Sequence, residues 1–144
     1  MEKIIYKNEK YYQIRIGDLN YGNHLGHDKL ITIIHDARCS FFENYGFKEL
    51  SIGEDNVGLI VNEINFKYKS QLYYSDNIKI TSKFYELSSV SVKMESVVKN
   101  MDNGELSASG FIKLVSFNFK TNKMVKFPEK FIALIKEHLI VENF

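Results

Sequence analysis

The chain has 144 residues, of which 44% are hydrophobic and 26% charged, and its formal net charge is +1. This length supports one hydrophobic core, so we expect a single domain over residues 1–144 that lacks the basic footprint of a nucleic-acid-binding protein. A lone cysteine, Cys39, and the lack of any apolar run near about 18 residues predict a cytoplasmic protein that does not enter a membrane.

The first predicted element is a strand over residues 11–19. Its apolar side chains share one face by period-two alternation: Tyr12, Ile14 and Ile16. If the strand stays extended, Asp18 and Asn20 emerge on that same face. Polar groups on a core-facing side need partners or a purpose, so this strand end is the first indication of a site.

A polar, glycine-rich turn and one long helix follow. The polar and glycine residues of the turn are Gly22, Asn23, His24, Gly26 and His27. Apolar residues then recur at helical spacing from Asp28 to Tyr45, with Asp28 as a candidate N-cap. A narrow polar edge of this helix includes Asp36. Gly46 is predicted to end the helix as a left-handed cap.

The rest of the sequence predicts four antiparallel strands and a short helix. The strands fall near residues 60–69, 78–84, 90–98 and 106–119, and the last should be central because parts of it are apolar on both faces. Asp102-Asn103-Gly104 is the clearest hairpin signal. Pro128 should lie in the first turn of a helix that runs to about Leu139. The order indicates an α+β domain in which a curved sheet faces one long helix.

Several short motifs resemble those of the hotdog-fold acyl-CoA thioesterases of the 4-hydroxybenzoyl-CoA thioesterase type. They are Asp18-Leu19-Asn20 in place of an Asp-x-Asp pair, the turn from Gly22 to His27, Asp36-Ala37-Arg38 in the helix, the stretch from Tyr68 to Asp76, and the closing turn from Val125 to Glu129. The resemblance covers about residues 10–135. It implies a hotdog fold, in which a curved antiparallel five-stranded sheet wraps a long central helix and a short C-terminal helix follows.

The same resemblance implies a function. Such a protein hydrolyses an acyl thioester of coenzyme A, or of acyl carrier protein, without a cofactor or metal. It works as a homodimer or homotetramer with sites at subunit interfaces. The second acid of the Asp-x-Asp pair serves as base or nucleophile in these relatives, but here that position is Asn20, an amide. Other branches place the catalytic carboxylate on the central helix, where Asp36 is the nearest match.

Thioester hydrolysis needs a polarised carbonyl and an activated water. Backbone N–H groups from Gly26 to Asp28, at the helix N-terminus, suit the first task. Candidates for the second are Asp18, Asp28, Asp36 and the histidines, of which His27 and His35 could act at neutral pH. Asn20 would orient the water or the thioester. Gly22, Asn23 and His24 should shape the turn that binds substrate. A metal site from His24, His27 and His35 is not expected, since their spacing matches no standard ligand pattern.

The sequence therefore predicts an acyl-CoA thioesterase that acts by general-base activation of water. Asn20 also motivates an alternative, a non-catalytic acyl-CoA or fatty-acyl binding protein of the same fold. A dehydratase acting on an acyl thioester is a third and weaker reading. The candidate base stays open among the carboxylates and histidines.

Overall fold

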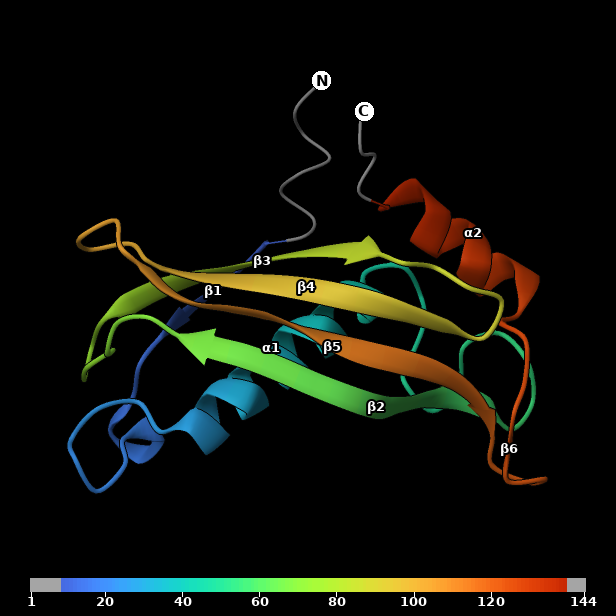
Figure 1. The fold of residues 1–144 in the computed structure, drawn as a ribbon, viewed down its shortest axis with the longest axis horizontal. Helices are drawn as coiled ribbons and strands as arrows, with labels where there is room; N and C mark the ends of the chain where they lie inside the picture. Colours follow the sequence, from blue (N-terminus) through green and yellow to red (C-terminus); the bar gives the residue numbers. More distant parts are fainter. Residues whose placement is uncertain (1–8, 140–144) are drawn as a thin grey trace. The chain divides into compact units, whose positions relative to one another are not determined.

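The computed structural model describes residues 9–139. In chain order the elements are β1 (Glu9–Gln13), the 3₁₀ turn η2 (Ile16–Asp18), α1 (His27–Glu43), β2 (Val57–Tyr68), β3 (Asn77–Tyr85), β4 (Ser91–Asn100), β5 (Leu106–Asn118), β6 (Lys123–Met124) and α2 (Glu129–Glu137) (Figure 1). The six-stranded sheet has the order β1-β3-β4-β5-β2, and β6 pairs with β5. The predicted strands, the long helix and the short final helix are all present, and the two-residue β6 is additional.

The chain divides into two compact units. Unit 1 comprises residues 1–40, 66–82 and 96–110, and unit 2 comprises residues 41–65, 83–95 and 111–144. α1 and strands β2 to β5 contribute residues to both units. The single domain expected over residues 1–144 stays a prediction.

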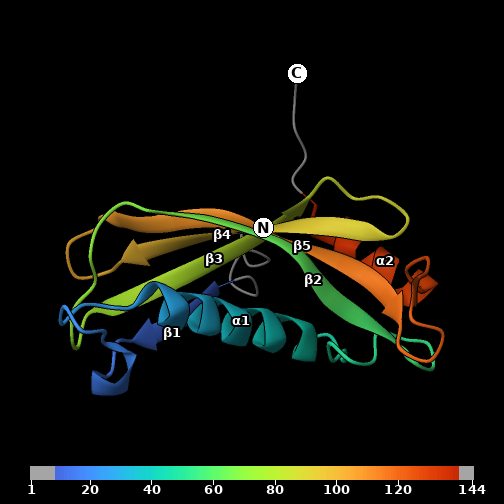
Figure 2. The same cartoon turned by 60° about the horizontal axis from the view of Figure 1, so that its bottom comes forward.

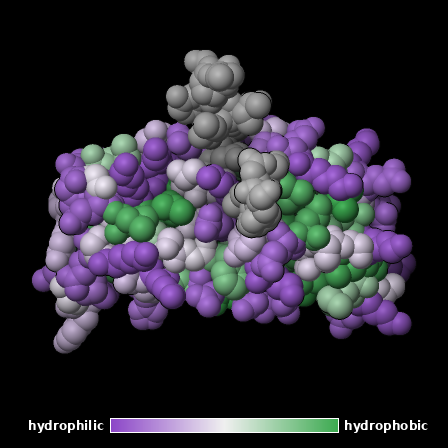
Figure 3. Space-filling model, turned by 45° about the horizontal axis from the view of Figure 1, so that its top comes forward, coloured by the Kyte–Doolittle hydropathy of each residue, from purple (hydrophilic) through white to green (hydrophobic). Residues whose placement is uncertain are grey.

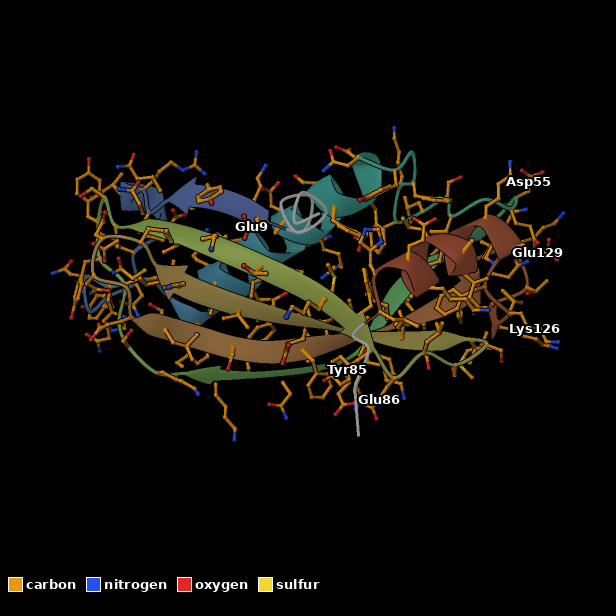
Figure 4. All side chains as sticks on the ribbon, turned by 90° about the horizontal axis from the view of Figure 1, so that it is seen from above. Glu9, Asp55, Tyr85, Glu86, Lys126 and Glu129 are labelled. Carbon is orange, nitrogen blue, oxygen red and sulfur yellow. The ribbon has the colours of Figure 1, made fainter. Side chains whose placement is uncertain are left out.

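In unit 1, β1 pairs antiparallel with the first half of β3, so that Tyr12 lies opposite Ile78. Glu9 at the start of β1 lies beside β3 (Figure 4), where its carboxylate is 3.5 Å from the Lys79 ammonium. α1 lies next to β1 on one face of the sheet (Figure 2), and Lys10 donates a hydrogen bond to Ser40, which lies near the end of the helix. Apolar side chains from α1 and the strands form the buried core of this unit: Leu30, Ile33, Ile34, Ile78, Ile80 and Val98.

The first strand is shorter than the alternation predicts. β1 ends at Gln13, and the chain turns into η2, so Ile16 is 73% exposed instead of buried. The Asp18 carboxylate explains the turn, because it accepts a hydrogen bond of 2.8 Å from the backbone N–H of Arg15. A short acidic side chain that binds its own backbone competes with strand extension. The predicted strand through residue 19 is therefore wrong beyond Gln13.

α1 begins at His27. The N–H of Leu30 donates to the Gly26 carbonyl over 3.0 Å, which makes Gly26 the N-cap and His27 the first helical residue. Asp28 is thus the second residue of the first turn, where its charge is favourable, and not the N-cap. At the other end, Gly46 has φ +83°, as a left-handed cap requires, and this prediction is confirmed.

Unit 2 has an aromatic core in which Phe42, Phe84 and Phe131 are at most 1% exposed. Phe42 packs against both other rings, with centroid separations of 6.0 Å to Phe84 and 5.3 Å to Phe131. Pro128 is the N-cap of α2 and precedes its first turn, and the helix ends at Glu137, before the predicted Leu139. These are shifts of one or two residues at helix ends.

Strand β2 is more exposed than its sequence pattern predicts. The alternation of Ile60, Ile64, Phe66 and Tyr68 with polar residues indicated one buried face, but Ile64 and Tyr68 are 48% and 51% exposed. Val61, on the opposite face, is 42% exposed. Within residues 9–139, β2 is an edge strand, because it ends the strand order and pairs with β5 alone. β5 lies between β4 and β2, which confirms its predicted central position.

None of the helices within residues 9–139 is long and apolar enough to span a membrane. On the face drawn in Figure 3, hydrophilic side chains predominate and apolar side chains gather in separate patches.

Candidate active site

Unit 1 contains a cleft of about 320 Å³ at the N-terminus of α1. Four segments line it: residues 20–25 before the helix, the first turn of α1, residues 68–72 after β2, and the start of β5. The first and third segments are joined by a hydrogen bond of 2.7 Å from the Leu25 N–H to the Leu72 carbonyl. The cleft therefore has walls that are fixed to one another by backbone hydrogen bonds.

Asn20 holds the turn that precedes the helix. Its backbone N–H donates to the His24 carbonyl over 2.8 Å, and its side-chain oxygen accepts hydrogen bonds from the N–H groups of Gly22 (2.8 Å) and His24 (3.4 Å). Asn23 completes the turn with φ +65°, a conformation that asparagine tolerates. The amide oxygen of Asn20 thus accepts hydrogen bonds from the backbone, and its NH₂ group is the part that can donate a hydrogen bond to a ligand.

His24 presents an acceptor nitrogen at this cleft. Its Nδ1 lies 3.2 Å from the Leu25 carbonyl oxygen. Because a carbonyl can only accept, Nδ1 carries the hydrogen, and Nε2 of the neutral ring keeps its lone pair. Gly22 gives the ring room, since a Cβ at that position would lie 3.1 Å from Nε2. The half-buried imidazole is therefore held in a defined tautomer with Nε2 as a candidate proton acceptor.

The start of α1 supplies the positive end of the site. The Gly26 N–H is already donated to the Asp18 carbonyl over 3.2 Å, but the N–H groups of His27 and Asp28 have no acceptor within the helix. Together with the helix dipole they can polarise a carbonyl oxygen. The Asp28 carboxylate folds back over Gly26, where a Cβ would lie 2.6 Å from its Oδ1. A side chain at position 26 would therefore displace the Asp28 carboxylate from this place.

Tyr68 forms part of the opposite wall and was not recognised as a site residue from the sequence. Its hydroxyl donates a hydrogen bond of 3.1 Å to the His27 carbonyl. Burial raises the pKa of the Tyr68 hydroxyl above its ordinary 10.0, and the negative charge of Asp28 raises it further. The phenol therefore stays protonated and keeps its donor for the helix.

The two candidate carboxylates do not line the cleft in unit 1. Asp18 is 7% exposed, and its side chain accepts hydrogen bonds from the Arg15 N–H (2.8 Å) and the Tyr12 hydroxyl (3.2 Å). Asp36 is exposed on α1, nine residues after His27, which is roughly 13 Å along the helix axis. The structure thus brings Asn20, His24 and His27 together and leaves Asp18 and Asp36 outside that group.

Two serines of the cleft, Ser70 and Ser107, carried no signal in the sequence, because only the pairing of distant segments brings them together. Among residues 9–139, His35 gathers with Cys39 and Glu49, whose potential ligand atoms all lie within 4.8 Å of one another, and not with His24 and His27.

The sequence matches the family model of the thioesterase-like superfamily over residues 14–135, a range that includes every residue of the cleft. The chain belongs to the thioesterase-like superfamily. The hotdog fold and the family expected from the motifs are thereby confirmed.

Solved structures agree with this thioesterase-like fold. A hypothetical protein of Staphylococcus aureus, solved in complex with CoA, has a TM-score of 0.82 and 18% identity, covering 95% of this chain and 88% of its own. A 1,4-dihydroxy-2-naphthoyl-CoA thioesterase from Synechocystis has a TM-score of 0.82 and 11% identity, covering 90% and 95%. A gentisyl-coenzyme A thioesterase has a TM-score of 0.73 and 22% identity, covering 83% and 95%. No curated protein matches the thioesterase-like chain by sequence.

Proposed function

We propose that this chain is an acyl-CoA thioesterase, which hydrolyses an acyl thioester to the free acid and coenzyme A. The observation that carries the proposal is the cleft of unit 1, where the acceptor nitrogen of His24 and the N-terminus of α1 line one space. Membership of the thioesterase-like superfamily supports it, as does the CoA bound to the structurally similar Staphylococcus aureus protein. An acyl carrier protein thioester is the alternative form of the substrate.

The chemistry follows from these groups. Nε2 of His24 takes a proton from a water molecule while the water oxygen attacks the thioester carbonyl carbon. The N–H groups of His27 and Asp28 stabilise the negative charge that develops on the carbonyl oxygen. When the tetrahedral intermediate collapses, the carbon–sulfur bond breaks and the imidazolium returns its proton to the departing thiolate. The NH₂ group of Asn20 is placed to orient the water or the thioester, as the sequence suggested.

The carboxylates take different parts in this proposal. Asp18 holds η2 in place through its hydrogen bonds and supports the turn that carries Asn20 and His24. Asp36 is exposed, and it can act only if a second copy of the chain brings it to the cleft. The unpaired side of edge strand β2, with its exposed Val61 and Ile64, supports such a homodimer, or a tetramer built from two of them.

Thiol release from a panel of short, medium, long and aromatic acyl-CoA esters tests the function. Hydrolysis of at least one class supports it, and no thiol release from any of them contradicts it. Asp18→Asn and Asp36→Asn, tested singly, show whether either carboxylate is needed for turnover. If the protein is stabilised for hours by an acyl-CoA without releasing thiol, the alternative applies, and the chain is a non-catalytic acyl-CoA binding protein.

A further inference from the structure

The strand side of the cleft contains a serine that is unusually well fixed. Ser107 lies at the start of β5, is 1% exposed and lines the cleft. Its carbonyl oxygen accepts two backbone hydrogen bonds, from the N–H of Lys69 (2.8 Å) and the N–H of Ser70 (3.2 Å). These bonds tie the segment after β2 to the start of β5, so the position of the Ser107 side chain is set by the backbone.

The hydroxyl of Ser107 keeps its hydrogen for another partner. The single hydrogen of the Ser70 hydroxyl is shared between two acceptors, Ser107 Oγ at 3.2 Å and the Leu106 carbonyl oxygen at 3.4 Å. Ser107 is the acceptor in its bond with Ser70, so its own O–H is not used there. A buried hydroxyl whose donor stays unused costs free energy, so such groups are normally paired. An oxygen atom on a molecule bound in the cleft would supply the missing acceptor.

The surroundings of Ser107 indicate which part of a ligand would lie there. Leu30, Leu72 and Ala108 give this side of the cleft an apolar lining suited to a hydrocarbon. Lys69, Ser70 and Gln71 add polar groups to the lining near Ser107. A few polar groups in a partly apolar lining are the usual way in which a pocket fixes the orientation of its ligand. The volume of about 320 Å³ is at the low end of the range of about 300–1,000 Å³ for ligand pockets, which favours a compact acyl group.

We propose that Ser107 is a specificity-determining residue that donates a hydrogen bond to an oxygen substituent on a compact acyl group. The preferred substrates are then short oxoacyl or hydroxyacyl thioesters over plain alkanoyl thioesters of equal length. This inference rests on the proposed function of the same cleft. His24 and the first turn of α1 are assigned to the thioester, and Ser107 belongs to a different segment of the lining. Ser107 is therefore assigned to the acyl group.

The test compares butanoyl-CoA with 3-oxobutanoyl-CoA in the wild type and in Ser107→Ala. Since the oxo substrate is intrinsically more reactive, the measured quantity is the ratio of the two kcat/KM values. Loss of one neutral hydrogen bond should lower this ratio by roughly five- to tenfold. Ser107→Cys, which fills the same space with a weak donor, should lower it as well. Ser109→Ala, on the same strand but outside the cleft lining, should leave it unchanged.

An unchanged ratio of the two kcat/KM values overturns the inference. If both kcat/KM values fall equally, Ser107 acts on the thioester that the substrates share, and if neither falls, it contributes nothing to specificity. Binding of two thioethers that cannot be hydrolysed, S-(3-oxobutyl)-CoA and S-butyl-CoA, separates this result from the function itself. A preference for the oxo compound that Ser107→Ala abolishes supports the inference even if the protein turns over no substrate. Equal affinity for both compounds, or binding of neither, overturns it whether or not hydrolysis is seen.

Discussion

At the level of single residues, His24 and Asn20 have complementary tasks in the turn before α1. The oxygen of Asn20 binds backbone N–H groups, and the Leu25 carbonyl fixes the tautomer of His24. An amide in the position of the usual acid is therefore compatible with catalysis if the imidazole is the base. This assignment makes the histidine, and not the asparagine, the residue whose loss should matter most to turnover.

Replacing His24 by Gln should lower kcat by roughly 10²–10⁴-fold with little change in KM, because a general base typically contributes this much. Steady-state kinetics on the best acyl-CoA of the panel would measure it, with melting curves to show that the variant folds. His35→Gln, which changes a histidine outside the cleft lining, is the matched control and should keep its activity. Full activity in His24→Gln together with loss in His27→Gln would assign the base to His27 instead.

Asp102 offers a pH-dependent effect away from the site. Its carboxylate accepts hydrogen bonds from the Asn77 backbone N–H (3.0 Å) and side-chain amide (3.2 Å), and the backbone bond first, then the amide, holds the pKa of Asp102 below its ordinary 3.8. A depressed folded-state pKa stabilises the protein above about pH 4, and this contribution is lost as the pH falls through the folded value.

Asp102→Asn should therefore lose less of its melting temperature than the wild type between about pH 5 and about pH 2. Circular dichroism melts across that range would measure the difference. Asp55→Asn removes another exposed carboxylate, labelled in Figure 4, and should lose as much as the wild type. Parallel curves for Asp102→Asn and the wild type would show that the bonds to Asn77 contribute nothing to folding.

At the level of elements, local chemistry made some boundaries predictable and others not. The helix cap at Gly46 and the Asp102-Asn103-Gly104 turn need a positive φ, which glycine adopts readily, so the residue types alone predict them. Both were found where expected, with Gly104 at φ +78°. The end of β1 was missed, because the bond from the Arg15 N–H to Asp18 competes with strand extension and alternation alone cannot weigh it. Ser107 could not be predicted as a site residue, since its partner Ser70 is 37 positions away.

Gly58 at the start of β2 is an element-scale constraint. A Cβ there would lie 2.5 Å from the Glu49 carbonyl oxygen and 2.9 Å from the Leu50 Cα, and backbone atoms cannot move aside cheaply. Gly58→Ala should therefore cost about 1–3 kcal/mol of unfolding free energy, as overpacking does. Denaturant unfolding would measure it against Gly17→Ala, where a Cβ meets nothing within 4 Å and stability should change by no more than about 0.5 kcal/mol. Equal stabilities for the two variants would contradict the steric argument.

At the level of the whole molecule, the proposed homodimer depends on the edge of β2. An exposed edge strand with apolar side chains invites pairing with another strand, and pairing with a second copy removes the unpaired edge. Val61 and Ile64 lie on opposite faces of β2, because their positions differ by three, and a second copy paired along the edge would flank both of these exposed side chains. In a two-fold arrangement each substituted residue occurs on both sides of the interface.

Ile64→Lys should accordingly convert the dimer to monomer, because two charges would be buried in a self-complementary contact without partners. Light scattering coupled to gel filtration would measure the mass. Met124→Lys is the matched control, since it adds the same charge at an equally apolar position that is 61% exposed on β6, and it should leave the assembly intact. A wild-type protein that is monomeric at every concentration would contradict the interface. In that case a monomer that hydrolyses acyl-CoA would show that the cleft of unit 1 needs no Asp36 from a partner.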